Sequence, residues 1–142
     1  MPVLLQIVLG SSLLLLCIAI HVYMLAKLIA GLRSKLWATS YAGVGITFQV
    51  VSGILLVLLF SHTVQIYIWA IALRVFGAID GYEEPIYFAL VTYTTVGYGD
   101  VTLGVPYRIL GAMASVNGII AFGLTTAFLV GFFARFLGEP PN

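Results

Sequence analysis

Charged side chains are scarce in this sequence of 142 residues, since only 8% of them are Asp, Glu, Lys or Arg. Soluble domains carry about 25% charged residues, so this scarcity argues against a soluble globular protein. The net charge of +1 provides no basic surface, and we expect no nucleic-acid partner. Cysteine is almost absent as well. Cys17 is the single one, so an intrachain disulfide cannot form, and we expect it to serve packing alone.

The apolar segments also lack the residues of catalysis and of transport. They contain no paired carboxylates, no activated nucleophile and no inverted repeat, so we expect neither an enzyme nor a transporter, and no cofactor. No ladder of arginines runs along the early segments, so we expect no voltage sensor. Only LGEPPN follows Phe136, and we expect no ligand-binding domain there.

Hydrophobic residues, in contrast, make up 62% of the chain, and the mean hydropathy of +1.15 indicates an integral membrane protein. Long apolar segments run from Val3 to Ile29, from Trp37 to Ile79 and from Ile109 to Phe136. A helix needs about 20 residues to cross a bilayer, so the third segment suits a single span. The first lacks a basic N-terminal region and is too long for a cleaved signal peptide, and we expect it to span as well.

The second segment is long enough for two crossings or for one very long helix. Lys27, Arg33 and Lys35 cluster before it, which predicts a cytoplasmic loop, and Arg135 lies beyond the last span. Two crossings would place that basic loop outside the cell. We therefore favour one crossing, with residues 37–45 along the interface, in a multi-pass protein of the cell membrane whose N-terminus lies outside and whose C-terminus is cytoplasmic.

The connection between the second and third segments reads DGYEEPIYFALVTYTTVGYGDV. Glu83, Glu84 and Pro85 suit the first turn of a helix, where the N–H groups are free and the dipole end is positive. From there to Thr94 is about a dozen residues, or roughly 18 Å of helix, which is too short to cross a membrane. The pattern predicts a re-entrant helix that enters from outside and directs its negative carboxyl end at the membrane centre.

The stretch TYTTVGYGD that ends this connection cannot form a stable helix, because each glycine costs about 1 kcal/mol relative to alanine. Unpaired backbone groups inside a bilayer cost several kcal/mol each, so the carbonyls need a partner. Glycines can adopt conformations in which successive carbonyls point the same way. Several chains around one axis would then stack rings of oxygens that replace the hydration shell of a cation.

Residues Thr92–Gly99 match the set T-x-x-T-V-G-Y-G and resemble the filter of the tetrameric potassium channel family, over about the last 90 residues of the chain. The resemblance implies an all-α membrane protein with three transmembrane helices, a re-entrant pore helix and a filter loop, assembled as a homotetramer. It implies passive conduction of K⁺, with membrane lipids as the other partners. By resemblance, Thr95 forms the innermost ion site with its hydroxyl and carbonyl. The sites above it come from the carbonyls of Val96, Gly97 and Tyr98, with Gly99 and Asp100 at the outer mouth.

The third segment contains NGIIAFGLTTAFL, which is similar to the inner pore-lining helix of two-helix bacterial potassium channels. The resemblance places a hinge at Gly118 and directs three side chains at a central cavity: Ile119, Phe122 and Thr126. Their spacing independently puts these three on one helical face. Close helix packing is the alternative role for Gly118 and Gly123.

These expectations define an organisation along the chain. Residues 1–36 hold an added N-terminal helix and a cytoplasmic loop, and this helix resembles that of small three-span prokaryotic channel-like proteins. Residues 37–142 form the pore domain. Its expected parts are an outer helix at about 46–76, a pore helix at about 82–94, the filter at 95–100 and an inner helix at about 108–136.

The chain departs from its relatives around the filter. Many relatives support the filter tyrosine with a pore-helix tryptophan, where this chain has Tyr87 and Phe88, so Tyr87 or Tyr93 is the expected substitute support for Tyr98. Proton-gated bacterial relatives carry a buried glutamate where this chain has Val91, so a carboxyl–carboxylate clamp on Asp100 is impossible. A weakly selective cation channel or a non-conducting channel-like subunit therefore remains the alternative to a potassium-selective pore.

Polar residues suggest two further features. His21 and His62, with Gln65 one turn on, are expected to face each other in the first two spans, either as a neutral hydrogen-bonded pair or as a proton sensor, since zinc would need three or four ligands. The residues expected near the outer mouth are Asp80, Glu83, Glu84, Asp100, Arg74 and Arg108. They sum to −4 + 2 = −2 for each chain, which predicts a negative vestibule that attracts cations.

Overall fold

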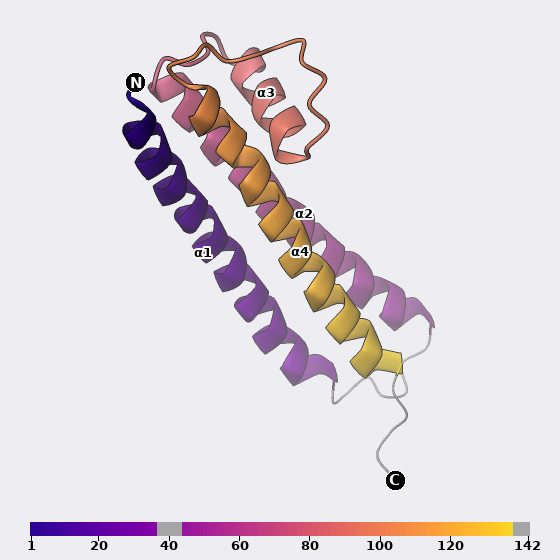
Figure 1. Cartoon of the computed structure of the whole chain (residues 1–142). Helices are drawn as coiled ribbons and strands as arrows, with labels where there is room; N and C mark the ends of the chain where they lie inside the picture. Colours follow the sequence, from indigo (N-terminus) through magenta and orange to yellow (C-terminus); the bar gives the residue numbers. More distant parts are fainter. Residues whose placement is uncertain (37–43, 138–142) are drawn as a thin grey trace.

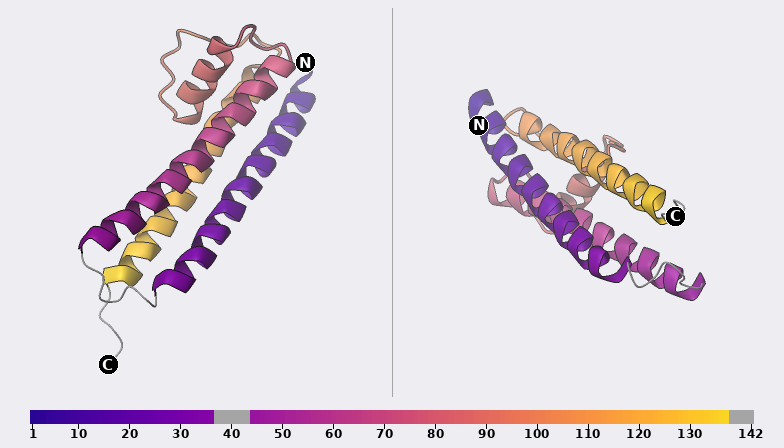
Figure 2. Two further views of the ribbon diagram at one scale, coloured as in Figure 1. Left: turned by 180° about the vertical axis from the view of Figure 1, so that it is seen from behind. Right: turned by 90° about the horizontal axis from the view of Figure 1, so that it is seen from below.

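The computed structural model describes residues 1–36 and 44–137 (Figure 1). These residues form four helices and no strand: α1 (Val3–Leu36), α2 (Val44–Val75), α3 (Glu83–Tyr93) and α4 (Arg108–Leu137). Three of them, α1, α2 and α4, run the length of the molecule side by side, and the short α3 lies against one end of this bundle (Figures 1 and 2).

Three helices are long and apolar enough to cross a membrane: Val3–Leu32, Val44–Val75 and Arg108–Ala134. The prediction of a helical, multi-pass membrane protein with three spans is thereby confirmed. Because α2 is one continuous helix, the long second segment makes one crossing and not two. Most of the expected interfacial stretch, residues 37–43, lies outside the described residues, whereas Gly45 already belongs to α2.

The N-terminus and α3 lie at the same end of the bundle, and the start of α2 and the end of α4 lie at the other (Figure 1). The backbone at three basic positions therefore lies at the end of the bundle far from α3, namely at Arg33, Lys35 and Arg135. This arrangement follows from the three long helices, which alternate in direction, so the N-terminus and the end of α4 lie at opposite ends.

Helix α1 is packed into the bundle through a buried glutamine. Gln6 is 1% exposed, and its Oε1 accepts the N–H groups of Ile109 and Leu110 at 3.1 and 3.4 Å. The first N–H groups of any helix lack partners inside that helix, so a side chain of α1 serves here as the cap of α4. Nothing in the local sequence of Gln6 indicates this contact.

Helix α3 has 11 residues, which corresponds to about 16 Å at 1.5 Å per residue. Glu83 and Glu84 occupy its first turn, where the positive end of the helix dipole stabilises them. Its buried side chains, Pro85, Ala89 and Tyr93, face the long helices, and Ala89 and Tyr93 join one core cluster with Trp69. The observed bounds lie within one residue of those expected at each end. The loop that follows runs back along α3 at the same end of the bundle (Figure 1).

Candidate functional site

The segment Thr94–Asp100 leaves the carboxyl end of α3 in an unusual backbone conformation. Its φ angles are positive at alternate residues, with +61° at Thr95, +56° at Gly97 and +79° at Gly99. In an ordinary strand successive carbonyls point to opposite sides, but residues of alternating handedness turn successive peptide planes the same way. Thr95 is β-branched, so its positive φ costs on the order of 1–3 kcal/mol and indicates a constrained position.

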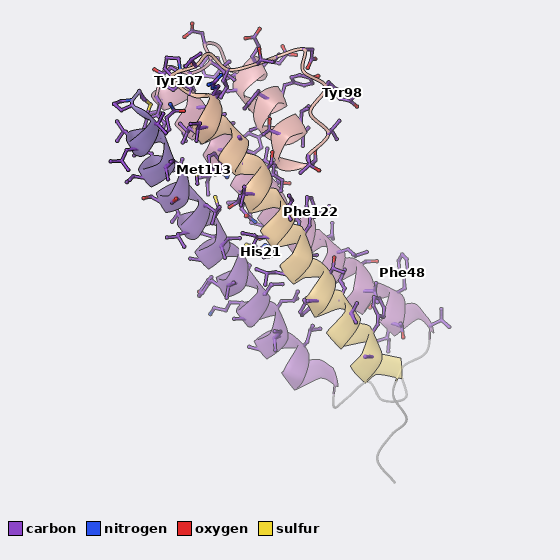
Figure 3. The ribbon with its side chains drawn as sticks, in the orientation of Figure 1. His21, Phe48, Tyr98, Tyr107, Met113 and Phe122 are labelled. Carbon is purple, nitrogen blue, oxygen red and sulfur yellow. The ribbon has the colours of Figure 1, made fainter. Side chains whose placement is uncertain are left out.

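The N–H groups at the start of this segment turn back to α3. Val96 and Gly97 both donate to the carbonyl of Val91, at 3.0 and 3.3 Å, and Thr95 donates to Thr92 at 3.0 Å. No hydrogen bond from the described residues reaches a carbonyl oxygen of residues 95–99. Residues 95–100 are exposed in the single chain, and Tyr98 lies on the loop away from α1 (Figure 3). The segment thus presents free carbonyls on an open face.

The end of the segment away from α3 is held by Asp100. Tyr87 donates its hydroxyl to Asp100 Oδ2 at 2.5 Å, and the Val101 N–H donates to Asp100 Oδ1 at 3.1 Å. The Tyr87 hydrogen bond holds the pKa of the Asp100 carboxyl below its ordinary value, and the backbone N–H groups act in the same direction. A carboxylate therefore stands beside the outer end of the loop, fastened by a phenol.

The expected support for Tyr98 is not found within its own chain. The hydroxyl of Tyr87 bonds Asp100, and the hydroxyl of Tyr93 lies 2.8 Å from His62 Nδ1. Support of Tyr98 by Tyr87 or Tyr93 therefore stays a prediction, and within one chain these two hydroxyls bond Asp100 and His62 instead.

The expected cavity-lining residues of α4 fall into two groups. Ile119 and Thr126 are exposed, as a pore-facing position in one separate chain should be. Phe122 instead stacks its ring on His62, with centroids 4.5 Å apart, and meets Tyr93 edge-on at 5.7 Å. It is still 42% exposed, so one face of its ring remains open. Nothing in the sequence indicates that Phe122 joins the exposed face of α4 to the histidines.

Gly118 lies where α4 passes the end of α3. A Cβ added there would overlap the carbonyl oxygen of Tyr93, so this position is restricted to glycine by close packing. At Gly123 an added Cβ would meet nothing within 4 Å, and the expectation of close packing there is wrong within the chain. A hinge at Gly118 stays a prediction.

His21 and His62 do lie together, with ring centroids 5.1 Å apart, but the two rings do not bond each other. Each has its Nε2 3.1 Å from the hydroxyl of Thr125 on α4. The described residues contain no group of three or more His, Cys, Asp or Glu that could hold a metal ion. Sequence reasoning missed Thr125 and Asn117, although both are polar residues within an apolar span and lie two helical turns apart.

The charged residues expected at the mouth gather at the α3 end of the molecule. Asp80, Glu83 and Glu84 are exposed there, and the Arg74 guanidinium lies 3.7 Å from the centre of the Tyr82 ring. No hydrogen bond in the described part of the chain joins these side chains to the carbonyls of residues 95–99.

The sequence that forms the loop and the helices around it matches a known family. The family model for ion channels matches residues 53–135, more than half of the chain. The chain belongs to the ion channel family. The match includes all of α3 and the loop Thr94–Asp100, together with most of α2 and α4. No curated protein and no solved structure matches this ion channel.

Proposed function

We propose that this ion channel conducts K⁺ passively as a homotetramer and that Thr95–Gly99 form its selectivity filter. The observation that carries the proposal is the alternation of positive φ at Thr95, Gly97 and Gly99, next to carbonyls without a protein partner. Carbonyl oxygens aligned in this way can replace the hydration shell of a dehydrated cation. The sequence TVGYG is the one that the potassium-selective relatives use for this purpose.

One chain supplies oxygens on one side of an ion only. A cation in single file needs oxygens all round it, and four copies about one axis provide a ring at each level of the filter. The exposed faces of residues 95–100 and of Ile119 and Thr126 are consistent with such an axis. The homotetramer therefore completes a site that a single chain leaves open on one side.

The pore helix α3 supports the same reading through its dipole. Its first turn carries Glu83 and Glu84, and its carboxyl end lies directly before Thr94 and Thr95. The partial negative charge at a helix C-terminus stabilises a cation nearby. We infer that α3 is re-entrant and that its carboxyl end points to an ion in the cavity below the filter, where Ile119 and Thr126 lie.

Orientation in the cell membrane is part of the proposal. The basic positions at the end far from α3 favour a cytoplasmic location for that end, which places the N-terminus and the filter mouth outside and the C-terminus inside. K⁺ is then the conducted substrate and not a resident cofactor. Lipids and the other three copies are the partners that the exposed apolar faces require.

A weakly selective cation channel or a non-conducting subunit is the second candidate. It is favoured by the Tyr98 hydroxyl, which receives no hydrogen bond from the described residues of its own chain. Filters depend on such supports for their width. A neighbouring subunit has to provide the bond if the first candidate is correct.

Ion flux in liposomes tests the proposal. The purified channel should pass K⁺ in strong preference to Na⁺, and cross-linking should trap tetramers. Gly97→Ala and Thr95→Ala should abolish conduction or selectivity, because alanine at positive φ costs about 1–2 kcal/mol in each of four copies and Thr95 supplies a ligand hydroxyl. Gly53→Ala is the matched control, since neither glycine has an atom within 4 Å of an added Cβ and only Gly97 has positive φ. Equal fluxes of Na⁺ and K⁺, or dimers alone, would rule out the proposal.

A further inference from the structure

Seven polar side chains from all four helices meet behind the pore helix, and no charged residue is among them. They are His21, Ser61, His62, Gln65, Tyr93, Asn117 and Thr125. Six of them are buried, and Thr125 is half-buried. Buried polar groups of a membrane span have no water to bond, so each donor and acceptor needs a protein partner.

The orientation of Gln65 sets the direction of the first bonds. Its Nε2 lies 3.3 Å from the carbonyl oxygen of Ser61, which can only accept, so Nε2 is the amide nitrogen and donates. The same Nε2 lies 3.2 Å from His21 Nδ1, and the Ser61 hydroxyl lies 2.8 Å from it. We assign Nδ1 as the acceptor of both groups. A neutral His21 then carries its hydrogen on Nε2. On the other side of the amide, Gln65 Oε1 accepts from Asn117 Nδ2 at 2.8 Å.

The series of hydrogen bonds continues through Thr125. His21 Nε2–H donates to the Thr125 hydroxyl at 3.1 Å, and that hydroxyl donates its own hydrogen to His62 Nε2 at 3.1 Å. His62 must then carry its hydrogen on Nδ1, which donates to the Tyr93 hydroxyl oxygen at 2.8 Å. The two histidines thus hold opposite tautomers, Nε2–H at His21 and Nδ1–H at His62.

The two ends of this series of bonds lie close together. The Asn117 side chain lies beside the Tyr93 hydroxyl, so the six side chains from Gln65 round to Asn117 form a ring. Asn117 Oδ1 is buried and accepts no hydrogen bond from the described residues. The bonds therefore run in one direction from Asn117 through Gln65 to Tyr93, and the ring is open between Tyr93 and Asn117 Oδ1.

The ring is attached to the beginning of the filter. Tyr93 is the last residue of α3, and its carbonyl packs on Gly118. The carbonyl of Thr92, one residue earlier, accepts from the Ser115 hydroxyl at 2.9 Å. Side chain and main chain at the end of α3 are therefore both held by α4, and the ring adds α1 and α2.

We propose that Tyr93, His62 and Thr125 are positioning residues of the filter, acting through a one-directional series of hydrogen bonds around this ring that makes α1 part of the pore. None of the three touches the ion. These residues replace the support for the filter that Phe88 cannot give. They act from the face of α3 that packs against the long helices. The functional part of this inference rests on the proposed potassium conduction, whereas the ring and its hold on the loop do not.

Nitrogen NMR of the channel in lipid bilayers tests the ring directly. The ring nitrogens of His21 and His62 should report the two opposite tautomers, both neutral at pH 7. Thr125→Val keeps the shape of the side chain and removes the bridging hydroxyl, so it should shift the Nε2 signals of both histidines. Thr125→Ser should restore them. The same tautomer in both histidines, or a charged one, would overturn the ring.

Hydrogen exchange and flux then test its hold on the filter. In Thr125→Val and Tyr93→Phe the amides of residues 94–97 should exchange about tenfold faster, because a buried hydrogen bond that holds the end of α3 is lost. The permeability ratio of K⁺ to Na⁺ should fall by about the same factor, with tetramers intact. Thr63→Val is the matched control, since its exposed hydroxyl bonds only Leu59 of its own helix.

The outcomes separate the two proposals. Faster exchange in the ring variants, but not in Thr63→Val or Thr125→Ser, supports positioning even if the parent protein carries no K⁺, which would defeat the proposed function alone. Unchanged exchange of residues 94–97 together with altered histidine signals would overturn the positioning role, because the ring would then exist without holding the filter.

Discussion

Asp100 illustrates how a single residue sets the properties of the outer mouth. It is exposed, it accepts from the Tyr87 hydroxyl and from the Val101 N–H, and both bonds favour its charged form. A carboxylate repeated four times around the proposed axis would raise the local concentration of cations. Such an effect is screened as the ionic strength rises.

The lowered pKa of Asp100 makes a prediction about acid. The charge contributes above the ordinary carboxyl range and is lost only as the pH falls through the lowered pKa. Tyr87→Phe removes the main cause of the shift, so its acid midpoint for conductance in low KCl should move to higher pH. Asp100→Asn should lower conductance more in low than in high KCl and remove the acid midpoint. Equal losses at both KCl concentrations would indicate damage to the filter instead.

Two glycines of helix α4 differ in how closely they are packed. Gly118 is pressed on the Tyr93 carbonyl, whereas Gly123 has open space beside it. Gly118→Ala should destabilise the folded channel by about 1–3 kcal/mol, as overpacking does in other cores. Gly123→Ala should be neutral or slightly stabilising, since alanine is favoured in helices by about 1 kcal/mol. Thermal unfolding of both variants in detergent measures this, and equal stabilities would contradict the packing assignment.

The contact of α1 with α2 and α4 predicts a response to pH. Both imidazoles are used as neutral groups, and a second proton on either would place a donor where a partner already donates. The titratable groups that join the histidines in this core are Cys17 of α1 and Tyr93 of α3, and the partners from α2 and α4 are uncharged. Lowering the pH from about 7 to below 5 should therefore change the open probability, with the change at the acid end of this range, because burial disfavours a charged imidazole.

Single-channel recordings across that range provide the measurement. The double variant His21→Ala with His62→Ala should lose the response. A response that survives in it would assign the sensor to the outer carboxylates, and a parent channel that does not respond would leave the histidines with the positioning role alone.

One end of the molecule holds the N-terminus, α3 and the acidic residues 80, 83, 84 and 100, and the other end holds the basic positions 33, 35 and 135 (Figure 1). We expect the first end to face the outside of the cell. The natural Cys17 is fully buried, so introduced thiols can be labelled on a quiet background. In intact cells an impermeant maleimide should label Val105→Cys, which is 67% exposed, and not Val44→Cys, which is 88% exposed at the opposite end. The reverse pattern would invert the topology.

Much of this architecture is determined by local sequence. Helix formation in a bilayer follows from continuous apolar runs, because every backbone group must be bonded within the segment, and the three spans were predictable for that reason. Glu83, Glu84 and Pro85 marked the start of α3, and the glycines at 97 and 99 marked a backbone that cannot be helical. These are properties of residues and their immediate neighbours.

Contacts between distant segments were decided by the tertiary structure alone. The cap that Gln6 provides for α4, the stacking of Phe122 on His62 and the bridge through Thr125 each join residues from different helices. Sequence periodicity states which residues share a helical face, but not the rotation or depth at which that face meets another helix. The histidines were visible in the sequence as polar residues in an apolar span. Their partners could not be predicted, because these contacts depend on how the helices pack.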